Sequence, residues 1–350
     1  MPDFKIAIVA PVHVPLTKEW IESLKAITVG KENVSVIIVD DSNGKVELPS
    51  NWRVYDYARQ LEELGPELYA RFEKFHKSSA CKNFGHWLAW KEGYDIVMGL
   101  DSDCVVPPNF ISEHLEALMM KSHGWTNVIK NTGWFSRGYP YVERERPTIL
   151  SLGLWEGELD LYGTDRVANP TKQVKDPMIT ASHEVADGIV PLSGMNWAAW
   201  TQAIPAFLLL PNFEYTHGEQ KKVYEFRRHD DIWGGYIFQR LMAIRNERIV
   251  YGKPIVWHQT VVKPEEDAKE EEAMIAFENS FYREVDYLVM TIEWGMYDDM
   301  FEAFSEAAAK RWKGTEFEPL IEALDLWVEL FKVAPAEEEE EEELGGDKEI

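Results

Sequence analysis

Two β-branched runs that flank a helical pattern constrain the fold of this chain more than any other feature of its sequence. Phe4 to Val9 forms the first run, and Val34 to Val39 forms the second, which ends in Asp40 and Asp41. Thr17 opens a predicted helix between them, with Trp20, Ile21 and Leu24 on its apolar face. A strand, a helix and a strand in this order predict a parallel sheet with its chemistry at the carboxyl ends of the strands.

The turns after these two strands hold the first candidate ligand contacts. The turn after the first strand, Ala10 to Leu16, contains no glycine, so the glycine-rich dinucleotide fingerprint is absent, and so is the P-loop pattern. We assign Pro11 and His13 in this turn to nucleotide binding. Asp40 and Asp41 can accept hydrogen bonds from a base or a ribose hydroxyl.

The alternative for this aspartate pair is structural. Asp40 and Asp41 could instead form an Asx turn that leads into Asn43 and Gly44. The sequence alone does not separate the two roles.

The next strand ends in a pair of carboxylates. Ser78 to Gly93 is predicted to be a capped helix, and it leads into a buried strand, Asp95 to Leu100. Asp101 and Asp103, with Ser102 between them, follow that strand directly and can bind a hard divalent ion. Such an ion would neutralise a diphosphate leaving group, whereas the structural alternative is two turn aspartates that cap the helix from Asn109 to Lys121.

Two further segments carry candidate catalytic residues. Arg137 and Arg144 lie in a loop, Ser136 to Arg146, whose guanidinium groups suit bidentate contact with phosphate. Surface ion pairs with neighbouring glutamates are the structural alternative. Asp230 and Asp231 precede an apolar helix, so one could cap the helix while the other acts as a general base or orients a sugar hydroxyl.

Three smaller features complete the candidate site. His258 ends a short apolar run and could complete a metal site as a neutral imidazole, or it could be a structural hydrogen-bonding residue. Gly194, Met195 and Asn196 form an irregular segment suited to close approach of a substrate. Trp233 follows the aspartate pair, and we assign it to substrate binding. Strands are also predicted near Asn127 to Lys130 and Arg248 to Tyr251.

Composition excludes some classes of partner. The 350 residues are 45% hydrophobic, which is enough for a sizeable core. Lys and Arg number 36 against 61 Asp and Glu, which argues against broad attraction to nucleic acid or to an anionic membrane. A phosphate ligand would therefore need a local cation. The segment from residue 334 to 350 contains seven consecutive glutamates and is predicted to be a disordered acidic tail.

The cellular location is predicted from cysteines and apolar runs. Cys81 and Cys104 are too few for a disulfide framework and match no metal motif, which favours a reducing compartment. The run from Ile6 to Ala10 is too short for a signal peptide, and Ile189 to Phe213 is too interrupted to span a membrane. We therefore expect a soluble, cytoplasmic protein.

From Pro264 onward the pattern turns helical, with apolar residues every three or four positions. We therefore predict an α/β domain over residues 1 to 262 and a helical region over residues 263 to 333. Three aromatic residues of this region look exposed and could form a homo-oligomer contact or pack back on the first domain: Trp294, Tyr297 and Trp312.

Taken in order, these segments resemble the reversibly glycosylated polypeptides, the family of UDP-arabinopyranose mutases. The matching stretches are Ser79 to Gly85, Leu100 to Cys104, Arg137 to Pro140 with Arg144, Gly153 to Trp155, Gly194 to Asn196, Arg228 to Gly235 and Ile255 to His258. The similarity covers roughly residues 4 to 262, and Lys82 and Asn83 in the first stretch are taken as nucleotide-binding on its strength. The family usually has three consecutive aspartates where this chain has Asp101, Ser102 and Asp103.

The resemblance implies an α/β glycosyltransferase fold of the A type, with a mostly parallel sheet flanked by helices, and a cytosolic location. It also implies that residues 1 to 262 form a nucleotide-sugar domain, that a divalent ion such as Mn²⁺ is bound, and that the protein interconverts the pyranose and furanose forms of a UDP-sugar. We place this ion, Mn²⁺ or Mg²⁺, on Asp101 and Asp103, and His258 could complete the site. A transient glycosyl link would map onto Arg137, supported by Arg144. Because a guanidinium is a poor nucleophile, Arg137 could instead only steady the departing diphosphate.

The sequence therefore leads first to a metal-dependent UDP-sugar mutase. An ordinary glycosyltransferase that passes the sugar to an external acceptor, with Asp230 or Asp231 as base, is the second reading. A non-catalytic nucleotide-sugar-binding subunit that acts with a partner is the third.

Overall fold

The computed structural model describes residues 3–13, 16–42, 48–129, 133–170, 182–218, 221–261 and 263–332. The Asn43 and Gly44 turn and the acidic tail lie outside these residues. The helices are α1 (Lys18–Thr28), α2 (Tyr57–Phe72), α3 (Asn83–Lys91), α4 (Phe110–Met119), α5 (Gly163–Ala168), α6 (Asp230–Ile244), α7 (Pro264–Val289), α8 (Tyr297–Arg311) and α9 (Ile321–Lys332). The strands are β1 (Ile6–Val12), β2 (Val34–Asp40), β3 (Arg53–Tyr55), β4 (Ile96–Leu100), β5 (Cys104–Val105), β6 (Lys121–Ser122), β7 (Arg146–Gly157), β8 (Glu184–Val185), β9 (Asn196–Trp200), β10 (Phe213–His217), β11 (Lys222–Phe226) and β12 (Arg248–His258).

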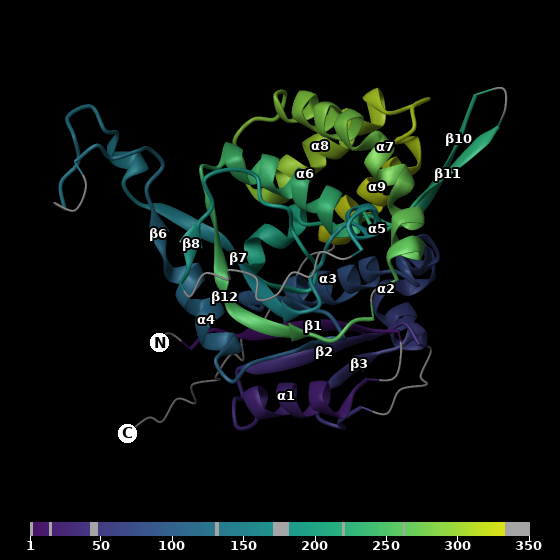
Figure 1. Cartoon of the computed structure of the whole chain (residues 1–350), viewed down its shortest axis with the longest axis horizontal. Helices are drawn as coiled ribbons and strands as arrows, with labels where there is room; N and C mark the ends of the chain where they lie inside the picture. The colour runs from purple at the N-terminus through teal and green to yellow at the C-terminus, as the bar shows by residue number, and fades with distance from the viewer. Residues whose placement is uncertain are drawn as a thin grey trace, which may run out of the picture.

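The main sheet has the order β3-β2-β1-β4-β9-β7-β12-β5 (Figure 1). β1 pairs in parallel with β2 and β4, β2 with β3, and β7 with β12. β9 runs antiparallel to both β4 and β7, so β7 and β12 point the same way as β1 and β4. The carboxyl ends of these strands therefore meet at one edge of the sheet, as the first strand–helix–strand unit predicts.

A short antiparallel strand closes this edge. His258 at the end of β12 pairs with Cys104 in β5, directly after the turn that ends β4. The pairing brings a histidine late in the sequence to the Asp101 to Asp103 turn, although more than 150 residues separate them.

Helices cover both faces of the sheet and separate two cores. Trp20 and Leu24 of α1 pack with Phe110 of α4 and the outward side chains of β1 and β4 on one face. The other core is continuous from β1 through α3 and α6 to the C-terminal helices α7, α8 and α9. The fold is thus the α/β class with a mostly parallel sheet flanked by helices that the sequence predicts.

The predicted helical C-terminal region is confirmed as helical, but it is not a separate layer. The indole Nε1 of Trp87 donates to Leu330 O at 2.9 Å, and that of Trp327 donates to Pro205 O, also at 2.9 Å. Tyr297 and Trp312 are 2% and 0% exposed, so they are core residues. Of the three aromatics considered for an oligomer contact or for packing on the first domain, only Trp294 is exposed, at 69%.

The strand predicted near Asn127 to Lys130 is wrong for the described residues 127 to 129, where the backbone bends. The Asn127 side chain forms a local turn, accepting from Ile129 N at 3.2 Å and donating to Trp134 O at 2.6 Å, so the β-branched pair Val128 and Ile129 cannot extend into a ladder. Residues 123 to 145, called the arm below, connect β6 to β7, and their described part, 123 to 129 and 133 to 145, projects from the body (Figure 1).

Two other boundaries differ. The helix expected from Ser78 begins as a 3₁₀ turn, Ser79–Lys82, before α3, and Ser78 makes no side-chain cap. The strand predicted over Arg248 to Tyr251 runs on to His258. Within the described parts of the chain, no helix is long and apolar enough to cross a membrane.

Candidate active site

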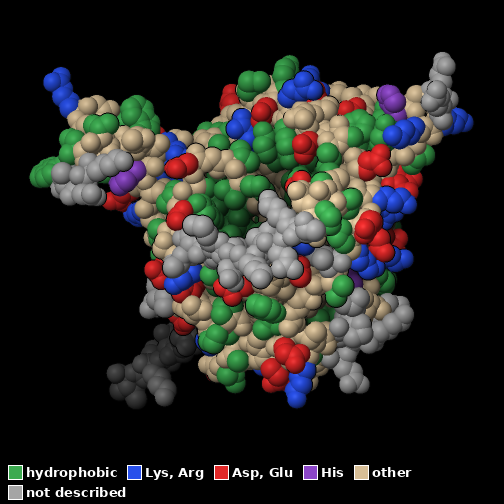
Figure 2. Space-filling model, viewed as in Figure 1, with side chains coloured by type: hydrophobic (Ala, Val, Ile, Leu, Met, Phe, Trp, Pro, Cys, Tyr) green, Lys and Arg blue, Asp and Glu red, His purple; other side chains and the backbone are tan. Residues whose placement is uncertain are grey.

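Two adjoining cavities open at the carboxyl edge of the sheet. The first, of about 430 Å³, is lined by Pro11, His13, Asp41, Lys77, Ser78, Ser79, Asp101, Ser102 and Asp103. The second, of about 710 Å³, shares Ser79, Asp101 and Asp103 with the first. Figure 2 shows the molecule hollowed near the centre of this face, with hydrophobic side chains on the wall. The Asp101 to Asp103 turn therefore separates two connected compartments.

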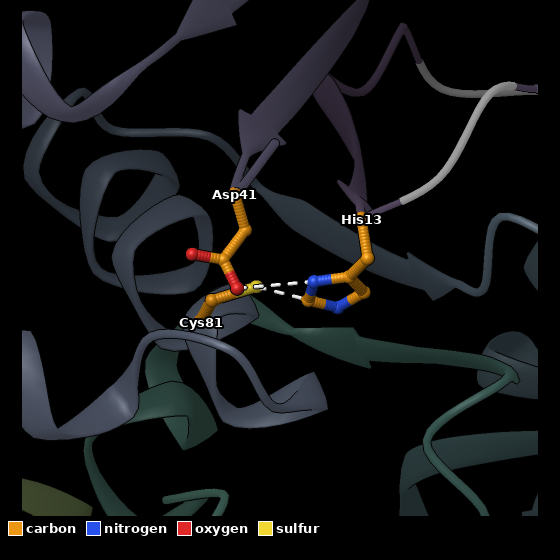
Figure 3. Close-up of side chains that lie close together, drawn as sticks. All are labelled: His13, Asp41 and Cys81. Carbon is orange, nitrogen blue, oxygen red and sulfur yellow. Dashed lines mark hydrogen bonds and ion pairs between the residues drawn. The ribbon is translucent and has the colours of Figure 1, made fainter. Parts of the chain in front are cut away.

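Asp41 supplies an ionised acceptor to the first cavity (Figure 3). His13 Nδ1 lies 3.0 Å from its Oδ2, and the Tyr57 hydroxyl donates to Oδ1 at 2.7 Å. Burial alone would raise the pKa of Asp41, but His13, Tyr57 and the backbone N–H of Lys77 hold it below its usual value. Asp40 turns away instead, since its carboxylate accepts from Ser42 N at 2.9 Å.

Cys81 is the third member of the cluster in Figure 3, with its Sγ 4.0 Å from His13 Nε2. Burial and the charge of Asp41 raise the pKa of its thiol well above the usual value. The sulfur, which is fully buried, is therefore an inert thiol rather than a thiolate.

Lys82 lies beneath the turn and not in the cavity. Its side chain is fully buried, and its ammonium group pairs with Asp101 and donates to Gly194 O at 2.8 Å. Burial would lower its pKa, but Asp101, Asp230 and Asp231 raise it above the usual value. Lys82 thus acts as a fixed counter-charge for the carboxylates, which explains a buried lysine at this place.

The carboxylate of Asp103 faces His258 across the second cavity. His258 Nε2 lies 3.4 Å from Asp103 Oδ2, while Nδ1 lies 2.7 Å from Glu158 O and so carries a proton toward that carbonyl. Burial would lower the pKa of His258, but Asp103 raises it, and His258 in turn holds the pKa of Asp103 below its usual value.

This pair fits a divalent ion. A carboxylate oxygen, an imidazole nitrogen fixed by a carbonyl, and the Cys104 sulfur lie within 4.8 Å of one another. Burial raises the pKa of the Cys104 thiol well above the usual value, and Mn²⁺ and Mg²⁺ prefer oxygen and nitrogen ligands. Asp103 and His258 are therefore the candidate ligands, with Asp101 at the same cavity wall and Cys104 as a bystander.

Asp230 and Asp231 begin α6 and line the second cavity. The prediction that one of them caps this helix is wrong, because His229 is the N-cap residue and no side chain caps it. Asp231 instead accepts from Gly194 N at 2.7 Å and from Ile232 N at 2.8 Å. Burial and the neighbouring Asp230 raise the pKa of Asp231 to about 8, and Oδ2 of Asp230 is buried without a hydrogen-bond partner.

Several predicted contact residues are structural. Asn83 donates to Leu209 O at 2.7 Å and accepts from Leu209 N at 3.0 Å, which joins α3 to the segment before β10. Asn196 donates to Leu154 O and Pro254 O and is fully buried. Trp233 is fully buried and stacks on Phe281 at 4.1 Å between ring centroids, so it faces the core and not the cavity.

Of the irregular segment after Pro191, Met195 lines the second cavity. Gly194 serves close packing of the protein itself, because a Cβ there would lie 3.0 Å from Lys82 Nζ and 3.4 Å from Asp231 Oδ2. The backbone at Gly194 is closely approached, as expected, but by the side chains of Lys82 and Asp231.

Arg137 and Arg144 are not brought to either cavity in this structure. Both lie on the arm, where Arg137 is exposed and Arg144 stacks on the rings of Tyr141 and Phe135 at 3.8 Å and 4.7 Å. The two glutamates considered as their partners pair with other residues, because Glu143 pairs with Arg146 and Glu145 with Lys121.

No sequence motif points to the segment between β7 and α5 as part of the site. Asp160 and Tyr162 of this segment line the second cavity, together with Arg166 of α5 and Arg228. Arg228 has a positive φ of 54° and pairs with Asp267 at 3.3 Å and Glu271 at 3.2 Å. A positive φ at a non-glycine residue cannot be read from composition, and no periodic pattern marks the segment.

A family model described as "Reversibly glycosylated polypeptide" matches residues 3–335. No curated protein sequence matches the chain. The match confirms the family that the sequence resembles, and it extends through the C-terminal helices.

Similar solved structures are distant. Glucosyl-3-phosphoglycerate synthase from Mycobacterium tuberculosis, in complex with Mn²⁺ and UDP-glucose, is 16% identical with a TM-score of 0.41, over 80% of this chain and 79% of that one. S. aureus TarS 1-349 in complex with UDP is 12% identical with a TM-score of 0.34, over 93% and 90%. The mannosyltransferase PcManGT from Pyrobaculum calidifontis, with GDP-Man and Mn²⁺, is 8% identical with a TM-score of 0.36, over 93% and 86%.

Proposed function

The chain belongs to the reversibly glycosylated polypeptide family, and from this premise we propose that it is a metal-dependent UDP-sugar mutase. It would interconvert UDP-arabinopyranose and UDP-arabinofuranose. The observation that carries the proposal is the position of the Asp101 to Asp103 turn between two connected cavities, with His258 opposite Asp103. This arrangement suits a diphosphate at the turn, with a nucleoside on one side and a sugar on the other.

The first cavity would take the nucleoside. Asp41 is an ionised acceptor on its wall, so it would accept hydrogen bonds from the base or the ribose. Pro11 and His13 lie on the same wall, and Lys77 supplies a positive charge in this otherwise acidic protein.

Asp103 and His258, with Asp101 beside them, would hold Mn²⁺ or Mg²⁺. When bound, such an ion neutralises diphosphate charge and stabilises UDP as a leaving group. Lys82 would hold the Asp101 carboxylate in position through their ion pair.

Arg137 is the proposed acceptor or stabiliser of the sugar, with Arg144 supporting it. In the covalent version, the bond from C1 to the β-phosphate oxygen breaks and its electron pair leaves with UDP. A bond forms between C1 and an Arg137 nitrogen, whose proton passes to a carboxylate, for which Asp230 or Asp231 is the candidate. Ring opening, closure through the other hydroxyl and return of UDP to C1 then reverse these transfers. In the ion-pair version no nitrogen–carbon bond forms, and Arg137 only steadies UDP.

The test is incubation of the purified protein with UDP-arabinopyranose and Mn²⁺, with and without a chelator, followed by chromatography of the sugar nucleotides. A chelator-sensitive equilibrium with UDP-arabinofuranose supports the mutase. Absence of conversion, although UDP binds in a metal-dependent way, contradicts it.

One observation favours a second function, transfer of the sugar to an external acceptor. Asp231 has a pKa of about 8 on the wall of the 710 Å³ cavity, and a general base is most effective when its pKa lies near the working pH. UDP release that depends on an added sugar or peptide acceptor would identify the transferase. Binding with neither reaction until another protein is added would identify a binding subunit.

A further inference from the structure

We propose that the arm, residues 123 to 145, acts on a second copy of the chain and brings Arg137 to the second cavity of that copy. The inference rests on the proposed function, because it supplies the arginine that the mutase needs. It explains why an arginine assigned to the reaction lies outside the cavity of its own chain.

The arm and the cavity lie at opposite ends of one strand. The arm leads into the first residue of β7, Arg146, whereas the cavity is built by the residues at and after the other end, including Trp155 and Asp160. β7 has 12 residues, which corresponds to a length of about 36 Å along the strand. Arg137 precedes Arg146 by nine residues, which span at most about 30 Å when fully extended. Arg137 could approach its own cavity only if the arm lost its folded structure.

The stem of the arm is fixed to the body. Gly124 N donates to Glu143 O at 2.8 Å, and Arg248 of β12 donates to Gly124 O at 3.3 Å. The Glu143–Arg146 ion pair is buried against Gly124, where an added Cβ would lie 1.8 Å from Glu143 Oε2. A rigid swing of the arm would have to break this packing.

The arm also has a small core of its own. The Tyr139 side chain is buried, its hydroxyl hydrogen-bonds with the backbone of Trp125, and its ring contacts that of Phe135 at 4.8 Å. The guanidinium group of Arg144 lies over the Phe135 ring, 4.7 Å from its centroid. The arm is therefore a preformed projection, and preformed segments lose little conformational entropy when they dock.

The outer surface of the arm is largely apolar, and Glu145, which pairs with Lys121 at the base of the arm, is the one exposed acidic residue in its described part. Six large apolar side chains are exposed there, with exposed fractions from 40% to 81%: Trp125, Val128, Ile129, Trp134, Tyr141 and Val142. Figure 2 shows these hydrophobic side chains gathered on the projection. Between Gly124 and Val142 the sequence contains Lys130 and Arg137 but no Asp or Glu. Exposed patches of this kind mark protein–protein contacts.

The second cavity complements the arm in charge. Eight of its lining residues are acidic against two arginines: Asp101, Asp103, Asp160, Asp165, Asp230, Asp231, Asp267 and Glu271. Arg166 and Arg228 already pair with acidic neighbours. Within the part of the chain that the structure describes, Arg137 forms no hydrogen bond or ion pair. A two-fold dimer would let each arm serve the cavity of its partner, so both sites would be complete.

Mixing two inactive variants tests the proposal. Arg137→Ala removes the arm's arginine and keeps the cavity, while Asp103→Asn disables the cavity and keeps the arm. Each is expected to be inactive alone, and an equal mixture is expected to recover about a quarter of the wild-type rate, because half of randomly formed dimers are mixed and each has one complete site. No recovery, although differently tagged subunits co-purify, would overturn the proposal. An active Arg137→Ala protein would overturn it as well.

A second measurement does not depend on activity. Sedimentation of the wild-type protein with UDP and Mn²⁺ is expected to show a dimer, which the double variant Val128→Asp/Val142→Asp converts to a monomer. Val29→Asp is the matched control, because Val29 is 78% exposed but lies after α1 and outside the arm. A monomeric wild type, or a dimer that survives the arm variant, contradicts the proposal. A dimer that depends on the arm in a protein without mutase activity would mean that the proposed function fails while the interface stands.

Discussion

At the scale of single residues, His258 and Cys104 both face Asp103 but differ in what they can offer a cation. His258 Nδ1 is engaged by Glu158 O, which leaves Nε2 directed at Asp103, whereas the buried Cys104 thiol keeps its proton. We expect His258→Ala to weaken Mn²⁺ binding about 10-fold or more, and Cys104→Ser to leave it unchanged. Titration calorimetry measures both. Equal losses in the two variants would show that the sulfur is a ligand and that the assignment of the site is wrong.

The raised pKa of Asp231 determines how the free energy of unfolding changes with pH. Its pKa is about 8 in the folded protein against an ordinary value of 3.8, so between these values the folded chain holds a proton that the unfolded chain has released. Stability must therefore fall as the pH rises through this window. In metal-free protein, Asp231→Asn should gain stability relative to wild type between pH 5 and pH 8, by on the order of 1 kcal/mol or more.

Urea unfolding at several pH values measures this difference. Asp325→Asn, at an exposed position on α9, is the matched control and should show no such trend. If the gap between Asp231→Asn and wild type stayed constant with pH, Asp231 would titrate outside this window, and its role as a base near neutral pH would lose its support.

At the scale of elements, the packing of α6 explains why a glycine, Gly234, follows Trp233. A Cβ at Gly234 would lie 2.1 Å from the backbone oxygen of Leu208, so the helix touches the preceding segment at this residue. Gly234→Ala should destabilise the protein by about 1–3 kcal/mol, since backbone cannot move aside as a side chain can. Gly188→Ala is the control, because nothing lies within 4 Å of its added Cβ. Denaturant midpoints compare the two, and similar midpoints would mean that α6 does not pack so closely.

Local sequence patterns predict some elements of this fold and not others. The first strands, α1 with its Thr17 cap and the Asp101 to Asp103 turn could be predicted, because each rests on local periodicity or on a cap. Met195 and Asp231 at the second cavity could also be predicted. The burial of Trp233, Asn83 and Asn196 could not, because an indole or amide that binds a ligand and one that fixes the core have the same local sequence. The strand predicted near Asn127 does not form, because the Asn127 side chain accepts a hydrogen bond from Ile129 N and the backbone bends there.

At the scale of the whole molecule, residues close to both ends of the described chain share one core. One hydrophobic core includes both Ala7 in β1 and Phe331 in α9. The candidate metal ligands Asp103 and His258 likewise join the turn after β4 to the end of β12. The boundary predicted at residue 262 therefore remains a prediction. Whether the two parts unfold separately or together can be measured.

We expect one cooperative unfolding transition, because α9 is held by indole hydrogen bonds to the body. Trp327→Phe would leave the Pro205 carbonyl buried without its donor, which costs about 1–3 kcal/mol. That loss should lower the midpoint of far-ultraviolet circular dichroism and of tryptophan fluorescence together, since both report the same core. Trp294→Phe, at a residue that is 69% exposed, should shift neither. The contradicting result would be two separate unfolding transitions, of which Trp327→Phe shifts the midpoint of only one. That result would mean that the C-terminal helices unfold independently. In that case the sheet alone would have to hold Asp230 and Asp231 in place, although α6 packs against α7 through Trp233 and Phe281.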